Sequence, residues 1–109
     1  MASEQYSYML TETAEADVDE ATDYIVNELH NPDAAAAFLD AMEEKLSEIC
    51  RSPKTGRLVR NPYLTRNDIR RVLVKNYIAY YIVDETEAEI IVLRVVYGGR
   101  DQDQIVEKM

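Results

Sequence analysis

The residues best suited to chemistry in this sequence are cationic side chains gathered in one segment. Residues 51–75 contain eight Lys and Arg residues and one acid, Asp68. Guanidinium groups bind carboxylate and phosphate oxygens in bidentate geometry, so the segment predicts a surface for an anionic partner. The same charges could instead form the polar face of ordinary strands, and the sequence leaves both interpretations open. The binding candidates are Arg57, Arg60, Arg66, Arg70 and Lys75.

Acidic side chains dominate the other parts of the chain. Residues 1–50 hold 13 Asp and Glu residues and a single base, Lys45, and the whole chain has a net charge of −9. An acidic protein approaches RNA slowly unless a basic surface dominates locally. The charge distribution therefore counts against an enzyme that works on RNA.

The sequence contains one cysteine, Cys50, and one histidine, His30. An internal disulfide cannot form, which fits a reducing compartment, and a Cys/His zinc site is not expected. No apolar run reaches the roughly 18 residues of a transmembrane helix, and the first residues lack the basic and apolar segments of a secretory signal. We therefore expect a cytoplasmic protein with no metal, no cofactor and no membrane association.

Two helices are predicted in the acidic half of the chain, after a short strand over about residues 5–11. Thr11 or Thr13 can cap the first helix. Asn31 and Pro32 suit the start of a second helix, over about residues 33–51, and the short connection makes the pair an antiparallel hairpin. The apolar stripe of the first helix is Ala14, Val18, Ala21, Ile25 and Leu29, and that of the second is Phe38, Met42, Leu46 and Ile49.

Strand-like periodicity follows the second helix. Strands are predicted over residues 56–60, 69–75, 77–84 and 89–97, and the last two are apolar on both faces, as in the interior of a sheet. The tail after them is predicted as a short helix or as disordered. The sequence thus predicts a single α+β domain over residues 1–109, in which a two-helix hairpin packs on a twisted antiparallel β-sheet of four or five strands.

Arg94 is an exception within the last predicted strand. By simple alternation it shares a face with Ile90, Val92 and Val96. A charge in that position must reach a partner or the surface. Either a role in a site or an ion pair with an acid such as Asp101 satisfies this requirement.

A set of short motifs follows in a fixed order along the chain: Thr11-Glu12-Thr13-Ala14, Asn31-Pro32, Gly56-Arg57, Arg70-Arg71, Asn76-Tyr77, Val92-Leu93-Arg94-Val95 and Gly99-Arg100-Asp101. In this order and spacing, the motifs resemble the RelE/ParE family of bacterial type II toxins, also known as plasmid-stabilisation toxins. The resemblance extends from about residue 6 to about residue 105. It implies a toxin that inhibits growth and that a cognate antitoxin neutralises. It also implies that the protein forms a homodimer or a toxin–antitoxin hetero-oligomer.

The family has two branches with different targets. RelE-like members cut messenger RNA on the ribosome, whereas ParE-like members inhibit DNA gyrase by binding. Cleavage needs cations beside the scissile phosphate and a group that moves a proton near the 2′-hydroxyl. If the protein is a nuclease, the resemblance implies a catalytic set of Arg71, Arg94, Arg100 and Tyr97. Tyr97 could instead pack against the helices as an aromatic residue at the end of a strand. A phenol with a pKa of about 10 is also a poor general base.

Three positions depart from the ribonuclease pattern. Ile78 follows Asn76-Tyr77 where ribonuclease members often carry an Arg, Val106 aligns with their catalytic Tyr, and Tyr97 stands where many members place a His. The resemblance therefore favours a ParE-like, non-enzymatic toxin directed at gyrase, for which the basic segment binds the target or the antitoxin. The alternatives are a RelE-like mRNA endoribonuclease that works on the ribosome, and a degenerate, non-toxic protein that still binds an antitoxin.

Overall fold

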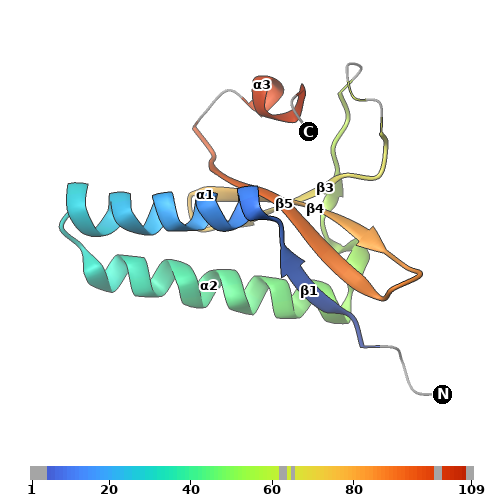
Figure 1. Cartoon of the computed structure of the whole chain (residues 1–109), viewed down its shortest axis with the longest axis horizontal. Coiled ribbons are helices and arrows are strands. Elements are labelled where there is room, and N and C mark those ends of the chain that lie inside the picture. The colour runs from blue at the N-terminus through green and yellow to red at the C-terminus, as the bar shows by residue number, and fades with distance from the viewer. Residues whose placement is uncertain (1–4, 62–63, 65, 100–101, 108–109) are drawn as a thin grey trace.

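The computed structural model describes residues 5–61, 64, 66–99 and 102–107, and it has the predicted α+β architecture. A helical hairpin covers one face of a five-stranded sheet, and a short C-terminal helix lies over the other face (Figure 1). The sheet order is β1-β5-β4-β3-β2. The elements are β1 (Ser7–Leu10), α1 (Glu12–Asp23), the π-helix η1 (Tyr24–Glu28), α2 (Pro32–Arg51), the 3₁₀ turn η2 (Pro53–Thr55), β2 (Arg57–Leu58), β3 (Arg70–Val74), β4 (Tyr77–Asp84), β5 (Glu89–Tyr97) and α3 (Gln102–Glu107).

Helix α1 begins with a side-chain cap and ends in a π-turn. The Thr11 Oγ1 atom accepts a hydrogen bond from the Ala14 backbone N–H at 3.1 Å, which selects Thr11 over Thr13 as the cap. The Leu29 N–H donates to the Tyr24 carbonyl at 3.2 Å, five residues back. The prediction that Leu29 belongs to the buried stripe is wrong, because the π-turn shifts the helical phase and leaves this side chain 54% exposed.

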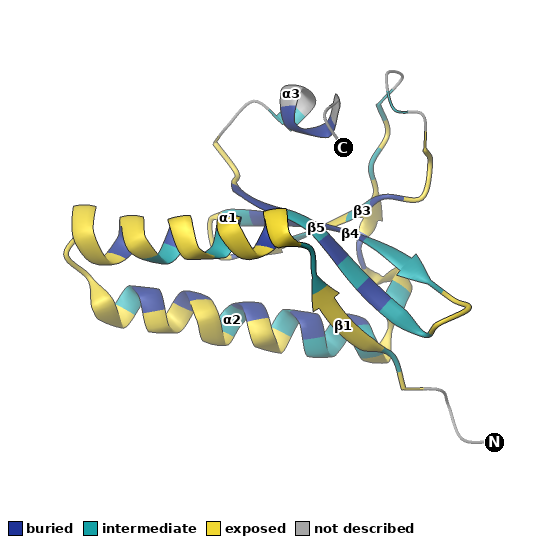
Figure 2. Cartoon of the chain, viewed as in Figure 1, coloured by how far each residue is buried: buried dark blue, intermediate teal, exposed yellow. Residues whose placement is uncertain are grey.

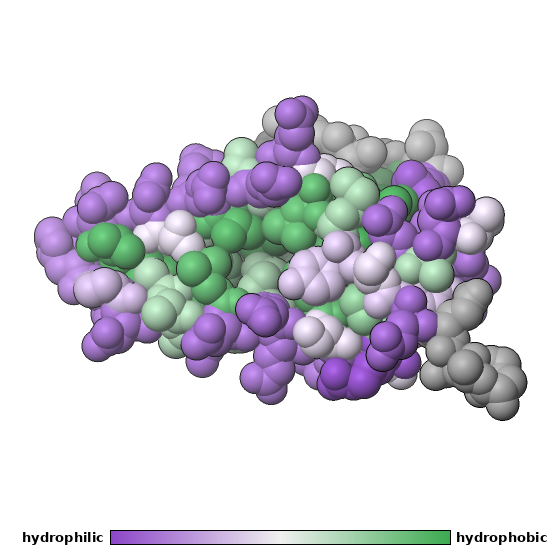
Figure 3. All heavy atoms as spheres, turned by 60° about the horizontal axis from the view of Figure 1, so that its bottom comes forward, coloured by the Kyte–Doolittle hydropathy of each residue, from purple (hydrophilic) through white to green (hydrophobic). Residues whose placement is uncertain are grey.

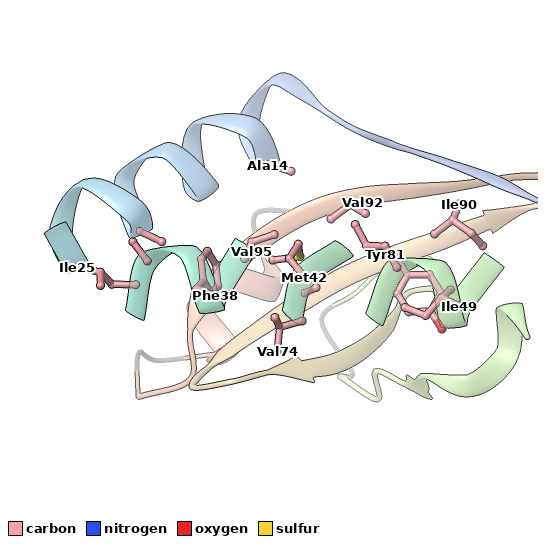
Figure 4. Packing of buried hydrophobic residues seen from close by; sticks show 14 residues of the cluster. Ala14, Ile25, Phe38, Met42, Ile49, Val74, Tyr81, Ile90, Val92 and Val95 are labelled. Atoms are coloured by element: carbon pink, nitrogen blue, oxygen red, sulfur yellow. The ribbon is translucent and has the colours of Figure 1, made fainter. Parts of the chain in front are cut away.

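Helix α2 starts as the sequence predicts. The Asn31 Oδ1 atom accepts from the Ala34 N–H at 3.0 Å, and Pro32 occupies the first turn, where a missing N–H costs nothing. The predicted stripe of Phe38, Met42, Leu46 and Ile49 is buried against the sheet. Figure 4 shows Phe38, Met42 and Ile49 of α2 in one cluster with Ile90, Val92 and Val95 of β5, and Leu46 belongs to the same cluster. This cluster holds the hairpin on the sheet.

The solvent-facing side of the hairpin carries both charged side chains and exposed apolar ones. Exposed residues cover the solvent side of both helices, while buried residues face inward (Figure 2). When the lower side of Figure 1 is turned toward the viewer, a strip of apolar side chains runs between two borders of hydrophilic ones (Figure 3). The exposed apolar side chains of the hairpin include Val26 and Leu39. Within the described residues, no helix has the length and apolar character needed to cross a membrane.

The sheet differs from a purely antiparallel one at β1. Strand β1 pairs in parallel with β5, whereas the other neighbouring strands pair antiparallel. Almost the whole chain separates β1 from β5, so no tight turn imposes the antiparallel direction on this pair. Strand β1 ends opposite Val92, and the last residues of β5 therefore have no strand partner on that side.

A register shift in the β4–β5 pair changes which β5 side chains face the helices. Tyr80 is opposite Arg94 and Tyr81 is opposite Val92, so β5 has one extra residue, Leu93. The prediction that Val96 shares a face with Ile90 and Val92 is wrong for this reason. Val95 joins the cluster under the helices, and Val96 packs in a second cluster on the opposite face.

Tyr81 fixes the loop between α2 and β2 to the sheet. Its buried hydroxyl donates to the Pro53 carbonyl and accepts from the Gly56 N–H, both at 2.8 Å. A Cβ atom on Gly56 would lie 2.5 Å from the Tyr81 hydroxyl and 2.9 Å from the Arg71 carbonyl oxygen. The absence of a side chain at position 56 is what permits this close approach.

Two tyrosines of β4 make stability sensitive to alkaline pH. Burial raises the pKa of Tyr81 and of Tyr77 above the usual value of about 10. Their stabilising contribution is therefore complete below about pH 10 and is lost as the pH rises through the folded-state values. The free energy of unfolding in urea should therefore fall as the pH rises above about 10, and the double variant Tyr77→Phe, Tyr81→Phe should flatten that fall. The exposed Tyr8→Phe is the matched control, and a slope that is equally steep in the double variant would contradict the assignment.

Candidate functional site

Exposed arginines of the basic segment gather on the sheet face opposite the helical hairpin. Arg57 of β2 lies directly across from Arg71 of β3, and both side chains are exposed. Like charges in opposing positions of an antiparallel pair are destabilising. A groove of about 550 Å³ surrounds them, and Tyr80, Gln102 and Val106 close its far side. The full lining is Arg57, Leu58, Val59, Arg60, Asn61, Arg70, Arg71, Tyr80, Gln102 and Val106, which we call the arginine groove.

The charges of the arginine groove are not neutralised within the described part of the chain. The ion pairs found there are Lys45–Glu48, Lys54–Glu85, Arg66–Asp68 and Arg94–Asp17. Arg57, Arg60 and Arg71 belong to none of these pairs. Their guanidinium groups therefore offer forked donors to an anion that approaches the open face of the sheet.

The other predicted binding residues have separate positions. Arg70 lines the groove, but its Nη1 atom donates to the Gly56 carbonyl at 2.7 Å and so supports the loop. Arg66 forms two 2.7 Å hydrogen bonds to Asp68, which raise the pKa of Arg66 and lower that of Asp68. Lys75 lies at the β3–β4 turn, with a φ of 55°, and lines a different groove. The structure thus brings Arg57, Arg60 and Arg70 together with Arg71 and leaves Arg66 and Lys75 apart.

Arg94 forms an ion pair, which is one of the two possibilities that the sequence left open. Its partner is Asp17 of α1. The Nε atom of Arg94 donates to Asp17 Oδ2 at 2.7 Å, and its Nη2 atom donates to Asp17 Oδ1 at 3.2 Å. These hydrogen bonds raise the pKa of Arg94. The same carboxylate accepts from the Val95 N–H at 2.9 Å, where β1 no longer covers the edge of β5. Asp101, the partner suggested by the sequence, lies outside the described residues.

Tyr97 is separated from Arg71 by the sheet. It pairs with Tyr77 across β4 and β5, with ring centroids 5.9 Å apart and an interplanar angle of 73°. It lines a groove beside the helices, whereas Arg71 lines the arginine groove on the opposite face. Arg100 lies outside the described residues. The structure therefore places Tyr97 and Arg71 on opposite faces of the sheet, while Arg94 is engaged by Asp17.

Two of the positions that depart from the ribonuclease pattern lie in the second apolar cluster. Ile78 is 7% exposed and Val106 is 3% exposed, and both pack on the face that α3 covers. The cluster consists of Ile69, Ile78, Tyr80, Val96, Ile105 and Val106. At these two places, apolar side chains fix α3 to the sheet.

Sequence reasoning missed the part that α3 plays in this face. The Tyr80 hydroxyl donates to Gln102 Oε1 at 2.6 Å, and Gln102 Nε2 donates to the Tyr97 carbonyl at 3.1 Å. The signal was Ile105-Val106, an apolar pair in an otherwise polar tail. Its contact surface on β4 and β5 depends on pairing across long sequence separations, which a local pattern does not reveal.

Comparison with known proteins identifies a family and a fold. Residues 8–102 match the family model described as the ParE toxin of the type II toxin–antitoxin system parDE. No curated protein sequence matches the chain. The fold is similar to that of a chain from the chromosomal ParDE system of P. aeruginosa, with a TM-score of 0.67, 23% identity and coverage of 85% of this chain and 96% of that one.

Two further structures share the fold. A chain from the RelBE2 toxin–antitoxin complex of Mycobacterium tuberculosis has a TM-score of 0.61 and 20% identity, covering 86% of this chain and 99% of that one. A chain from the intact E. coli RelBE complex has a TM-score of 0.55 and 18% identity, covering 87% and 99%. Because the family model matches nearly the whole chain, this protein belongs to the ParE toxin family of type II toxin–antitoxin systems.

Proposed function

We propose that this protein is a cytoplasmic toxin that inhibits DNA gyrase by binding and that a cognate antitoxin neutralises it. The observation that carries the choice of binding over RNA cleavage is the burial of Ile78 of β4 and Val106 of α3 in the apolar cluster between α3 and the sheet. Ribonuclease chemistry needs a cation and a proton-transfer group at the reacting atoms. Apolar side chains packed in a cluster supply neither.

Two other features support a binding function. The Arg94 guanidinium is held by a carboxylate that is only 8% exposed, so a substrate phosphate would have to compete with Asp17 for it. Tyr97 faces the helix side of the sheet, away from Arg57 and Arg71. Tyr97 would thus have to move to the other face of the sheet before it could act together with Arg71 on one phosphodiester.

We assign the arginine groove to the antitoxin. Arg57 and Arg71 repel one another across β2 and β3, and a bound carboxylate between them removes that repulsion. Leu58, Val59 and Val106 give the groove an apolar component, which suits a peptide segment better than a chain of phosphates. An antitoxin segment with acidic and apolar side chains has the complementary chemistry.

Expression in bacteria, with and without the antitoxin encoded beside the gene, tests the proposed function. We expect growth arrest with intact transcripts and an induced DNA-damage response, and relief when the antitoxin is co-expressed. Arrest accompanied by cut transcripts would show instead an mRNA endonuclease. A soluble, folded product that leaves growth unchanged would identify a non-toxic member of the family.

A further inference from the structure

A second groove lies on the helix side of the sheet, at the end of the hairpin where the π-turn is. It has a volume of about 750 Å³ and runs between the end of α1, the start of α2 and the last residues of β4 and β5. Its lining residues are Asp17, Glu20, Ala21, Tyr24, Ile25, Leu29, Ala34, Ala37, Phe38, Lys75, Asn76, Tyr77, Val95, Val96 and Tyr97. We call it the tyrosine groove. It shares no lining residue with the arginine groove.

The walls of the tyrosine groove carry large apolar side chains that the fold itself does not bury. Tyr24 is 52% exposed, Leu29 is 54% exposed and Tyr97 is 51% exposed. Phe38 and Tyr77 lie at the base, with ring centroids 4.8 Å apart. The small side chains of Ala34 and Ala37 leave room for a partner to approach α2. Half-exposed aromatic side chains around a concave surface are typical of protein–protein contacts.

The charge around this groove is the opposite of that in the arginine groove. Asp17 and Glu20 line the α1 wall, and Asp23 and Glu28 are exposed on the same stretch of helix. The charge of Asp17 is balanced by Arg94, whereas Glu20, Asp23 and Glu28 form none of the ion pairs in the described residues. The one cation among the lining residues, Lys75, lies across the groove at the β3–β4 turn.

From this combination we infer that the tyrosine groove is a docking surface for an amphipathic protein segment with aromatic or branched aliphatic anchors flanked by Lys or Arg. The anchors pack among Tyr24, Leu29 and Tyr97, and the cations lie along the acidic α1 wall. The partner of this surface therefore has the opposite charge to the acidic segment that suits the arginine groove. Because the two grooves lie on opposite faces of the sheet, both can be occupied at once.

The test is a selection of random twelve-residue peptides on the immobilised full chain, with depletion on the variant Tyr24→Ser, Leu29→Ser. Both side chains are more than half exposed, so the variant is expected to fold, and a circular dichroism spectrum and melt verify this. The inference predicts enriched peptides that combine aromatic or branched aliphatic residues with Lys or Arg. Enrichment of acidic or uncharged peptides, or no enrichment over the depleted pool, would overturn it.

A synthetic copy of the most enriched peptide then separates the groove from other surfaces. Its dissociation constant, measured by fluorescence polarisation, should rise about tenfold or more for Tyr24→Ser, Leu29→Ser and several-fold for Glu20→Lys. The variant Arg57→Glu should leave it unchanged, because Arg57 lies in the other groove. Loss of binding in Arg57→Glu, with the groove variant unaffected, would assign the peptide to the arginine groove and sink the inference.

Discussion

Replacement of Asp17 by alanine is expected to lower the free energy of unfolding by about 3–5 kcal/mol, the range typical of a broken buried ion pair. The carboxylate is 8% exposed and accepts hydrogen bonds from Arg94 Nε, Arg94 Nη2 and the Val95 N–H. Its removal leaves a partly buried guanidinium and an edge N–H of β5 without their acceptor. The measurement is urea unfolding followed by circular dichroism.

Asp19→Ala is the matched control, since Asp19 lies two residues along the same helix and is exposed. It should change the free energy of unfolding by no more than about 0.5 kcal/mol. A double-mutant cycle with Arg94→Met isolates the contribution of the pair, and we expect a large coupling energy. An Asp17→Ala variant as stable as Asp19→Ala would show that α1 is not anchored to β5 through this carboxylate.

Arg57→Glu is expected to make the protein slightly more stable and, at the same time, a much weaker binder of its antitoxin. On the folded chain, the introduced carboxylate would lie opposite Arg71 and exchange a cross-strand repulsion for an attraction worth about 0.2–1 kcal/mol. Toward an acidic antitoxin segment, however, the new carboxylate is a like charge. We expect the dissociation constant to rise about a hundredfold, or about 2.8 kcal/mol, by titration calorimetry.

The double variant Arg57→Glu, Arg71→Glu sharpens this test. Two glutamates repel one another as two arginines do, so stability should return close to that of the parent, while antitoxin binding should fall further. Arg66→Glu is the control outside the groove, because Arg66 is engaged by Asp68 and is absent from the groove lining. If antitoxin affinity survives both charge reversals but gyrase inhibition does not, the arginine groove belongs to the target instead.

Local patterns in the sequence predicted the elements and their order. The Asn31 cap and Pro32 set the start of α2, and continuous apolar runs set the bounds of β4 and β5. Such features depend on residues within a few positions of one another, which a sequence displays directly. The same locality explains why the stripe on α2 was predicted correctly.

The errors come from irregularities that have no local signature. The π-turn at Tyr24 exposed Leu29, and the extra residue in β5 moved Val96 to the second cluster. Simple helical or strand periodicity cannot anticipate either one, because each inserts one residue into a regular repeat. Both irregularities lie close to functional candidates, since the π-turn forms one end of the tyrosine groove and the extra residue precedes Arg94.

The sequence indicated which cationic residues could form a binding surface, but it did not indicate how the candidate residues are arranged in space. The basic segment pointed to an anion-binding surface, and Arg57, Arg60, Arg70 and Arg71 do share a groove. The separation of Tyr97 from Arg71 depends on which face of β4 and β5 each side chain occupies. The partner of Arg94 came from α1, 77 residues earlier in the chain. Contacts of this kind follow from the tertiary fold alone.

The most direct test of the proposed function uses purified components. The folded chain is added to DNA gyrase and relaxed plasmid, and a parallel reaction contains ribosomes with a defined messenger RNA. We predict inhibition of supercoiling that the antitoxin reverses, with the messenger RNA intact. Normal supercoiling together with ribosome-dependent cleavage of the messenger RNA would contradict the account.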